Sequence, residues 1–287
     1  MKLGVICDGI SQNLRHALNV MNEFDIEYAE LQFIDGKEVG DHSKRQINII
    51  KSLLENYGKP VSCLSRHIFA GLSMSNRPGD LEHQKHMDDL KRVIEMAHEV
   101  KSPLVRIMSS RKEQILWGSN GAEKWNVKQG AWESLPPLIA PAVELARSED
   151  LTLVIETGNG TMVNSNYTAK KLIDDLNAKD ALKVLWDPAN SCWCHENAYP
   201  EGYEEVRDGY LGHIHIKDVR VDSPRATLEV KKMGDGQLAH LFEPIANALR
   251  NDKYDGVISF ESVYHNGDGD FETGFRSSIE LFKQRFH

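Results

Sequence analysis

Eight short runs rich in β-branched and other apolar residues recur along the chain, and longer amphipathic segments separate them. This alternation is typical of βα units around a parallel sheet. Several runs stay apolar until their last residues, as expected for strands that are buried on both faces and carry function at their carboxyl ends. The runs begin at Leu3, Tyr28, Val61, Leu104, Leu151, Lys183, Gly212 and Gly256.

Helical patterns fill the intervals between these runs. In residues 43–58 one helical face carries Ile47, Ile50, Leu53 and Leu54, and Gly58 provides a C-terminal stop. Similar stripes mark residues 84–100 and 271–286, and the second of these would close the sheet against the first helix. No Pro/Ser-rich linker divides the chain, and α/β barrels typically have about 250 residues. We therefore predict a single α/β domain over residues 1–287, a (β/α)8 barrel.

The composition restricts the partners of the protein. The formal net charge is -9 and there is no Lys/Arg-rich block, which disfavours nucleic-acid binding. No apolar run approaches the roughly 20 residues of a membrane span, and the first ten residues lack the pattern of a signal peptide. Few, scattered cysteines fit a reducing compartment. We expect a cytoplasmic protein with a small-molecule partner, and leave homo-oligomerisation open.

Two connections are longer than closure of a barrel requires. Residues 111–126 include Trp117, and residues 192–203 include Trp193. Both follow predicted strands at their carboxyl ends, where barrels place their active sites, so each is a candidate loop over a substrate. The alternative is a solvated insertion with a few packed aromatic side chains.

Four strand ends each carry one side chain that can bind a metal: Glu156, Asp187, His215 and Glu261. The strand ends of a barrel converge on one mouth, where three carboxylates without a counter-ion would repel one another. A bound cation resolves this conflict. Three oxygen donors and one imidazole suit Mn²⁺ best, while Mg²⁺, Co²⁺ and Zn²⁺ are also compatible. For any single one of these residues, a capping carboxylate or a paired core histidine is the alternative.

Further polar residues lie at predicted strand ends. His67, Arg106 and Lys217 could orient sugar hydroxyls or an anionic group of a substrate. Structural pairing with Glu30 or Asp218 is the competing interpretation. Lys217 is the strongest candidate, because it shares a strand face with His215.

The ordered segments IETGNG, LWDPAN, GHIHIKD and YDGVISFES, with a Gly-x-Gly turn at Gly234, resemble the xylose-isomerase-like TIM barrels. This group contains sugar isomerases, epimerases such as the ketose 3-epimerases, and apurinic endonucleases. The resemblance is detailed in the second half of the chain and rests mainly on strand and helix rhythm in the first half. Glu30 also resembles an acidic residue that the second strand of this group often carries.

The resemblance implies roles for particular residues. In the epimerase branch, the positions matching Glu156, Asp187, His215 and Glu261 bind the metal, and the two glutamates exchange the substrate proton. The family ligand lies two residues before Lys217, which selects His215. His213 faces the same way and belongs either to the core or to the surroundings of the site.

One position departs from the family pattern. Members commonly carry a histidine three residues after the aspartate, where this chain has Asn190. An amide can donate to a sugar oxygen, but it is a poor metal ligand and no general acid near neutral pH. The predicted substrate-contacting residues are Asn190, Lys217, His67, Arg106, His213 and Trp117.

These observations favour a metal-dependent sugar isomerase or epimerase, in which a glutamate removes a proton next to a carbonyl and an enediolate forms. A keto-sugar lyase or dehydratase would use the same first step. An apurinic endonuclease would need a histidine in place of Asn190 and an Asp/His pair where this chain reads LEVKKM. A non-catalytic sugar-binding barrel is the remaining alternative.

Overall fold

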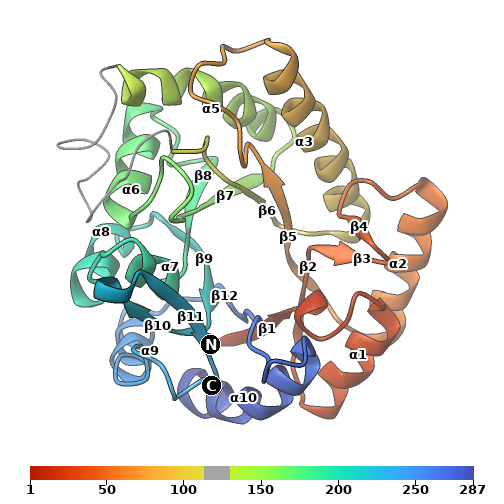
Figure 1. Cartoon of the computed structure of the whole chain (residues 1–287). Coiled ribbons are helices and arrows are strands. Elements are labelled where there is room, and N and C mark those ends of the chain that lie inside the picture. The colour runs from red at the N-terminus through yellow and green to blue at the C-terminus, as the bar shows by residue number, and fades with distance from the viewer. Residues whose placement is uncertain (113–129) are drawn as a thin grey trace.

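The computed structural model describes residues 1–112 and 130–287, so Trp117 lies outside the described residues. Eight parallel strands form a closed barrel in the order β1-β12-β9-β8-β7-β6-β5-β2, which confirms the predicted (β/α)8 fold (Figure 1). Each strand falls on one of the eight apolar runs. The strands are β1 (Lys2–Ile6), β2 (Tyr28–Leu31), β5 (Val61–Ile68), β6 (Leu104–Ile107), β7 (Thr152–Glu156), β8 (Leu182–Trp186), β9 (Leu211–Ile216) and β12 (Val257–Phe260).

The parallel register brings the functional strand ends to one level. In the β9–β12 pair, His215 lies beside Ser259, and in the β7–β8 pair, Glu156 lies beside Leu185. The side chains of β12 are all buried, as expected for a strand covered on both faces. The carboxyl ends of these strands therefore open on the same mouth of the barrel.

Longer helices surround the barrel (Figure 1). Ser43 and Gly58 cap α2 at its two ends, which explains why the helical pattern of this segment has sharp boundaries. The longer helices are α1 (Leu14–Glu23), α2 (Lys44–Tyr57), α3 (Leu81–Val100), α5 (Ala131–Ser148), α6 (Asn166–Asp175), α9 (Phe242–Asn251) and α10 (Phe271–Phe286). Among the described helices, none combines the length and apolar character that a membrane crossing requires.

The last helix closes the ring against the first, as the sequence predicts. Phe275 of α10 packs edge-to-face on Phe24 at the end of α1, with 5.7 Å between the ring centroids. The Arg276 guanidinium pairs with the Glu23 carboxylate at 2.6 Å. Apolar packing with an ion pair at its edge thus joins the two ends of the chain.

Two β-hairpins at the mouth are absent from the sequence predictions. One consists of β3 (Phe33–Ile34) and β4 (Lys37–Glu38), and the other of β10 (Asp218–Asp222) and β11 (Thr227–Lys231). The second begins directly after β9 and Lys217, so its root lies beside the strand end of His215. Short helical turns complete the mouth: η1 (Cys7–Gly9), α7 (Pro188–Trp193), η2 (Ala198–Gly202), α8 (Tyr203–Val206) and η3 (Ser223–Arg225).

Candidate metal centre

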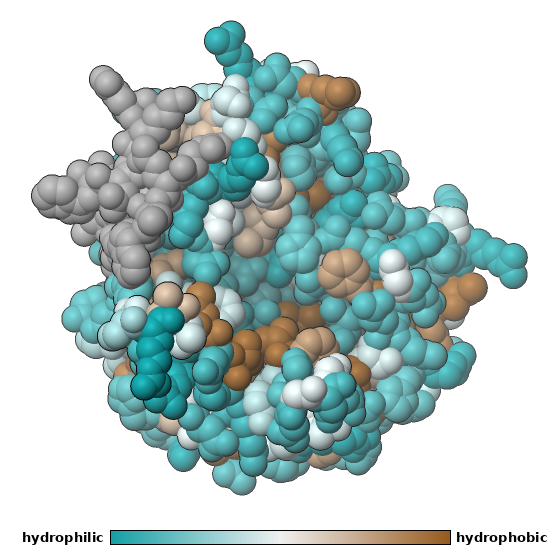
Figure 2. All heavy atoms as spheres, viewed as in Figure 1, coloured by the Kyte–Doolittle hydropathy of each residue, from teal (hydrophilic) through white to brown (hydrophobic). Residues whose placement is uncertain are grey.

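Four strand ends bring their side chains together at the barrel mouth. One ligand atom from each of Glu156, Asp187, His215 and Glu261 lies within 4.8 Å of the others. Glu156 is the last residue of β7, Asp187 follows β8, His215 belongs to β9 and Glu261 follows β12. We call these four residues the ligand cluster. The space-filling view in Figure 2 shows a hollow at the centre of this face of the molecule.

His215 presents one ring nitrogen to the carboxylates. Its Nδ1 lies 3.6 Å from Glu156 Oε1 and 3.6 Å from Glu261 Oε2. This buried Nδ1 has no hydrogen-bond partner among the described residues. At the other side of the ring, Nε2 lies 2.8 Å from Glu30 Oε1. A carboxylate that accepts from one ring nitrogen leaves the other free to bind a cation.

The ligand cluster fits a divalent cation. Burial alone would lower the pKa of His215, but the carboxylates of Glu30, Glu156 and Glu261 raise it well above the ordinary value. Three carboxylates around one imidazole thus produce a negative potential at Nδ1, and a proton or a metal ion bound there is stabilised by it. The donor set of oxygen and imidazole nitrogen suits Mn²⁺, Mg²⁺, Co²⁺ or Zn²⁺.

Lys217 lies between two acids of the ligand cluster. Its Nζ is 2.5 Å from Asp187 Oδ2 and 2.6 Å from Glu261 Oε2. Burial raises the pKa of Asp187 to about 6, because Lys217 offsets only part of the desolvation and of the repulsion from neighbouring carboxylates. Burial also acts to raise the pKa of Glu261, but Lys217 and His215 outweigh it and hold that pKa well below its ordinary value.

Asp187 has a second function in the local fold. Its Oδ1 accepts hydrogen bonds from the backbone N–H groups of Ala189, at 2.8 Å, and Asn190, at 3.3 Å. These bonds cap the first turn of α7. Pro188 begins this turn and has no backbone N–H that would need an acceptor. One oxygen of the carboxylate is therefore held by the helix while Oδ2 faces the ligand cluster.

Glu156 is held from two sides. Arg106 Nη1 lies 2.8 Å from Oε2, and Asn190 Nδ2 donates to Oε1 at 3.1 Å and to the carbonyl of Thr157 at 2.9 Å. Burial would raise the pKa of Glu156, but Arg106 and His215 lower it below the ordinary value. The amide of Asn190 thus positions a glutamate of the ligand cluster.

The other residues predicted to contact a substrate, Arg106, Lys217 and His67, differ in how deeply they are buried in the barrel mouth. Arg106 and Lys217 pair with acids of the ligand cluster rather than with Glu30 or Asp218. The His67 side chain is 42% exposed at the rim, with Nδ1 2.7 Å from Glu38 Oε1 and Nε2 3.3 Å from Arg106 NH2. It is the member of this set that is most open to a substrate.

His213 lies in a buried layer beneath the ligand cluster. Its Nε2 is 2.7 Å from Glu30 Oε2 and 3.2 Å from Ser259 Oγ. Glu30 therefore bridges both histidines of β9, and Ser65 Oγ donates to the same carboxylate. Burial opposes ionisation, but the two histidines lower the pKa of Glu30 well below its ordinary value.

Two further residues shape the mouth: Trp193, from the segment expected to cover a substrate, and Asp218, which the sequence suggested only as an ion-pair partner. The Lys217 ammonium lies 5.1 Å from the centroid of the Trp193 ring, so this indole borders the ligand cluster. Asp218 organises the Gly-x-Gly turn, because its carboxylate accepts from four backbone N–H groups: those of Val219, Gly234, Gly236 and Leu238. An aspartate directly after a predicted strand, 16 residues before a Gly-x-Gly turn, is the sequence signal that could have indicated this anchor.

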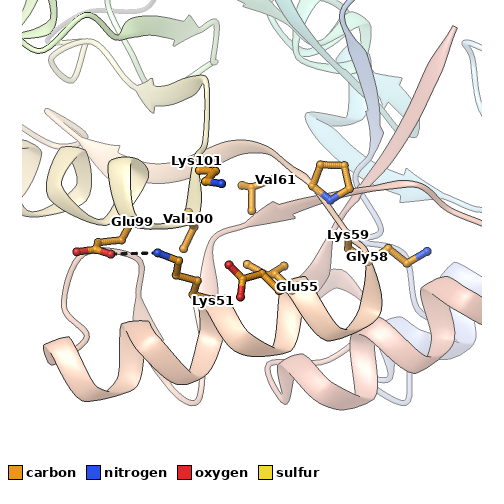
Figure 3. Close-up of a pocket in the computed structure, with 10 residues that line it drawn as sticks. Lys51, Glu55, Gly58, Lys59, Val61, Glu99, Val100 and Lys101 are labelled. Carbon is orange, nitrogen blue, oxygen red and sulfur yellow. Dashed lines mark hydrogen bonds and ion pairs between the residues drawn. The ribbon is translucent and has the colours of Figure 1, made fainter.

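A separate cavity of about 230 Å³ lies between the C-terminal ends of α2 and α3 (Figure 3). It contains charged side chains that already have partners: Lys51 pairs with Glu99 at 3.5 Å, and Lys59 donates to a backbone carbonyl at 2.7 Å. Val61, at the start of β5, also lines it. This cavity is thus at the end of the barrel opposite the ligand cluster, where barrels do not place their active sites.

A closed parallel barrel with acids and a histidine at its strand ends defines a class, the (β/α)8 barrels with a candidate cation site at the mouth. The sequence pattern of the xylose isomerase-like TIM barrels matches residues 18–285, and the chain belongs to this family. This confirms the resemblance seen in the sequence segments. Comparison with curated protein sequences found no match.

Solved structures share the whole architecture. The IOLI protein with a bound zinc atom has a TM-score of 0.75 at 17% identity, covering 100% of this chain and 98% of that one. D-psicose 3-epimerase from Clostridium cellulolyticum H10 has a TM-score of 0.72 at 14% identity, covering 100% of both chains. 3-Keto-D-glucoside 4-epimerase from E. coli has a TM-score of 0.70 at 17% identity, covering 99% of both. At these identities the likeness shows the fold alone.

Proposed function

We propose that this protein is a divalent-metal-dependent isomerase or epimerase that acts on a sugar or keto-sugar. The observation that carries the proposal is the position of Glu156 and Glu261, whose carboxylates both lie 3.6 Å from Nδ1 of His215, a nitrogen without a hydrogen-bond partner in the described part of the chain. Two carboxylates that share one cation position can also reach the two faces of a substrate held there. The zinc-bound and epimerase barrels with the same fold support this assignment.

The ligand cluster would hold one metal ion, with Mn²⁺ as the best match to its donors. Such an ion supplies electrophilic polarisation of a carbonyl and favours negative charge on its oxygen. The residues of the chain would bind the ion and transfer the protons. Asp187 and His215 would hold the metal, while Glu156 and Glu261 would both bind it and exchange protons with the substrate carbon.

Neighbouring residues set the orientation of the two proposed bases. Arg106 and Asn190 hold Glu156, while Lys217 holds Glu261, so each carboxylate is fixed by a different set of donors. Removal of a proton by one glutamate and its return by the other to the opposite face would epimerise the carbon. Return at the neighbouring carbon would isomerise the sugar.

Exchange of solvent deuterium into the substrate carbon tests the proposal. Metal-loaded wild-type protein should catalyse exchange on at least one ketose or 3-keto sugar. Glu156→Gln or Glu261→Gln keeps a neutral oxygen ligand but removes the base, so turnover should fall by roughly 10² to 10⁴-fold. Metal occupancy should fall far less. Undiminished exchange in the metal-loaded double variant would exclude the two glutamates as bases.

A further inference from the structure

A second cavity, of about 220 Å³, lies at the mouth of the barrel, where Trp193 separates it from Lys217 and the ligand cluster. We call it the side cavity. The β10–β11 hairpin forms one wall, the end of α7 forms another, and residues after β6 and β7 close it. Trp193 and Leu228 belong to its lining.

Trp193 connects this cavity to the proposed reaction centre. The indole lines the side cavity and also lies 5.1 Å from the Lys217 ammonium, which in turn contacts two acids of the ligand cluster. Its Nε1 is buried and has no hydrogen-bond partner within the described ranges. A molecule bound at the ligand cluster beside Lys217 would therefore reach the side cavity by passing a single side chain.

The wall formed by the hairpin is firmly anchored. Asp218, the first residue of β10, binds four backbone N–H groups, and β10 and β11 pair over five residue positions. Leu228 nevertheless stays 47% exposed and points its apolar surface toward a cavity that it lines. Leu228 and Trp193 thus give two walls of the side cavity an apolar surface.

The chemistry of the walls fits a neutral ring that carries hydroxyl groups. Trp193 and Leu228 offer apolar surface for the C–H face of a ring, while Asn159, Ser223 and Thr227 can exchange hydrogen bonds with its hydroxyls. Lys112 and Asp222 both line the cavity, and Asp222 pairs with Arg225 at 3.6 Å. An anion such as a phosphate would meet the Asp222 carboxylate as well as the Lys112 ammonium.

The volume of the side cavity limits how much of a ligand can occupy it. Pockets for complete small-molecule ligands usually measure about 300–1,000 Å³, so a cavity of about 220 Å³ suits one ring of a larger molecule. We propose that the side cavity is a subsite for a second sugar ring, and that the substrate is a keto-glycoside rather than a free monosaccharide. This inference rests on the proposed function, because it requires that the reacting sugar occupies the ligand cluster.

Two variants and one control test the subsite. Leu228→Ala removes apolar wall, and Ser223→Trp fills the cavity from an exposed turn. The control is Leu81→Ala, which truncates a leucine that is 88% exposed at the start of α3 and does not line the cavity. Deuterium exchange and calorimetric binding would be measured with a keto-hexose and with a disaccharide that carries the same keto-hexose ring.

We expect the disaccharide to bind more tightly than the keto-hexose in the wild-type protein. Leu228→Ala should raise KM for the disaccharide by about threefold to tenfold, with the keto-hexose KM and both kcat values unchanged. Ser223→Trp should abolish the preference for the disaccharide, and Leu81→Ala should preserve it.

Each contrary result has a distinct meaning. Equal binding and exchange of both sugars, unaffected by the cavity variants, would overturn the subsite and leave the proposed function intact. Tighter binding of the phosphorylated keto-hexose than of the disaccharide would also overturn it. Preferential binding of the disaccharide that the cavity variants abolish, without exchange on either sugar, would support the subsite and contradict the proposed chemistry.

Discussion

The Glu30 carboxylate binds the imidazole of His215 from below, with 2.8 Å between Oε1 and Nε2. Both side chains are fully buried, so no solvent competes for this bond. The contact fixes the plane of the ring and directs Nδ1 toward Glu156 and Glu261. Carboxylates in this position orient a histidine and increase its strength as a metal ligand.

Replacing Glu30 should therefore weaken metal binding without removing a ligand. We expect Glu30→Gln to lower metal affinity about 10 to 100-fold, measured by competition with a chelator. Glu99→Gln, which alters a surface ion pair with Lys51, should leave the affinity unchanged. Equal affinities of the Glu30 variant and the wild-type protein would show that this contact does not tune His215.

The strand ends were predictable from the sequence because the strands of a closed barrel are buried on both faces, which restricts the residue types along them. A run that is buried on both faces turns polar only where it leaves the sheet, so the residue types at the ends of β7, β8 and β12 already indicated the mouth. The convergence of Glu156, Asp187 and Glu261 followed from topology alone. Their assignment as metal ligands and bases stays a prediction.

The partners of those residues were less predictable. Arg106 and Lys217 could have paired with several acids, and sequence spacing does not select among side chains that meet through space. The structure pairs Arg106 with Glu156 and assigns Asn190 to the same carboxylate. The β10–β11 hairpin was missed for a different reason: its strands are partly exposed and alternate apolar with charged residues, so they lack the apolar runs that marked the barrel.

Residues assigned only to coordination should behave differently from the two glutamates. We expect Asp187→Asn and His215→Ala to lose metal and activity together, because each removes a ligand of the cluster. Elemental analysis of wild-type protein purified without chelator should show about one divalent ion per chain. Asp180→Asn, at a surface position, is the matched control. Two or three tightly bound zinc ions in the wild-type protein would instead favour the endonuclease branch.

Lys217 provides a test of charge balance in the ligand cluster. Lys217→Met keeps a similar length but leaves Asp187 and Glu261 buried without their cation. Loss of one partner of a buried ion pair costs about 3–5 kcal/mol, so the metal-free protein should be strongly destabilised. Saturating Mn²⁺ should recover part of this loss. Denaturant unfolding with and without the ion measures the difference, and an equal loss in both conditions would contradict this account.

We expect the stability of the protein to depend on pH because of the buried side chain of Glu196. This buried carboxylate accepts from the Asn166 backbone N–H at 2.9 Å and from Ser191 Oγ at 2.7 Å. Burial raises its pKa from 4.5 to about 7. The folded state therefore binds the proton more tightly than the unfolded state. The resulting stabilisation is complete below about pH 4.5 and is lost as the pH rises through about 7.

The expected contribution of this group is roughly 3 kcal/mol between pH 5 and pH 8. Glu196→Gln is neutral throughout, so its unfolding free energy should fall less steeply over this interval than that of the wild-type protein. Glu144→Gln, at an exposed position, should keep the wild-type slope. Parallel slopes for wild-type protein and Glu196→Gln would show that Glu196 ionises normally.

The Gly-x-Gly turn leaves no space for a side chain at Gly236. A Cβ at Gly236 would lie 2.1 Å from Asp218 Oδ1, the carboxylate that accepts from the Gly236 backbone N–H through its other oxygen. A real side chain cannot approach that closely, so either the turn or the Asp218 side chain must move. Because the same carboxylate also binds Gly234 and Leu238, the movement would break several bonds at once.

We expect Gly236→Ala to lower the unfolding free energy by about 1–3 kcal/mol, the usual cost of overpacking. The effect should extend to function, because Asp218 follows Lys217 directly and roots the hairpin that lines the side cavity. Gly160→Ala is the matched control, since a Cβ there meets no atom of residues 1–112 or 130–287 within 4 Å. Denaturant unfolding of the two variants, together with metal affinity, provides the test. If Gly236→Ala is as stable as Gly160→Ala, the turn is not held by the Asp218 carboxylate.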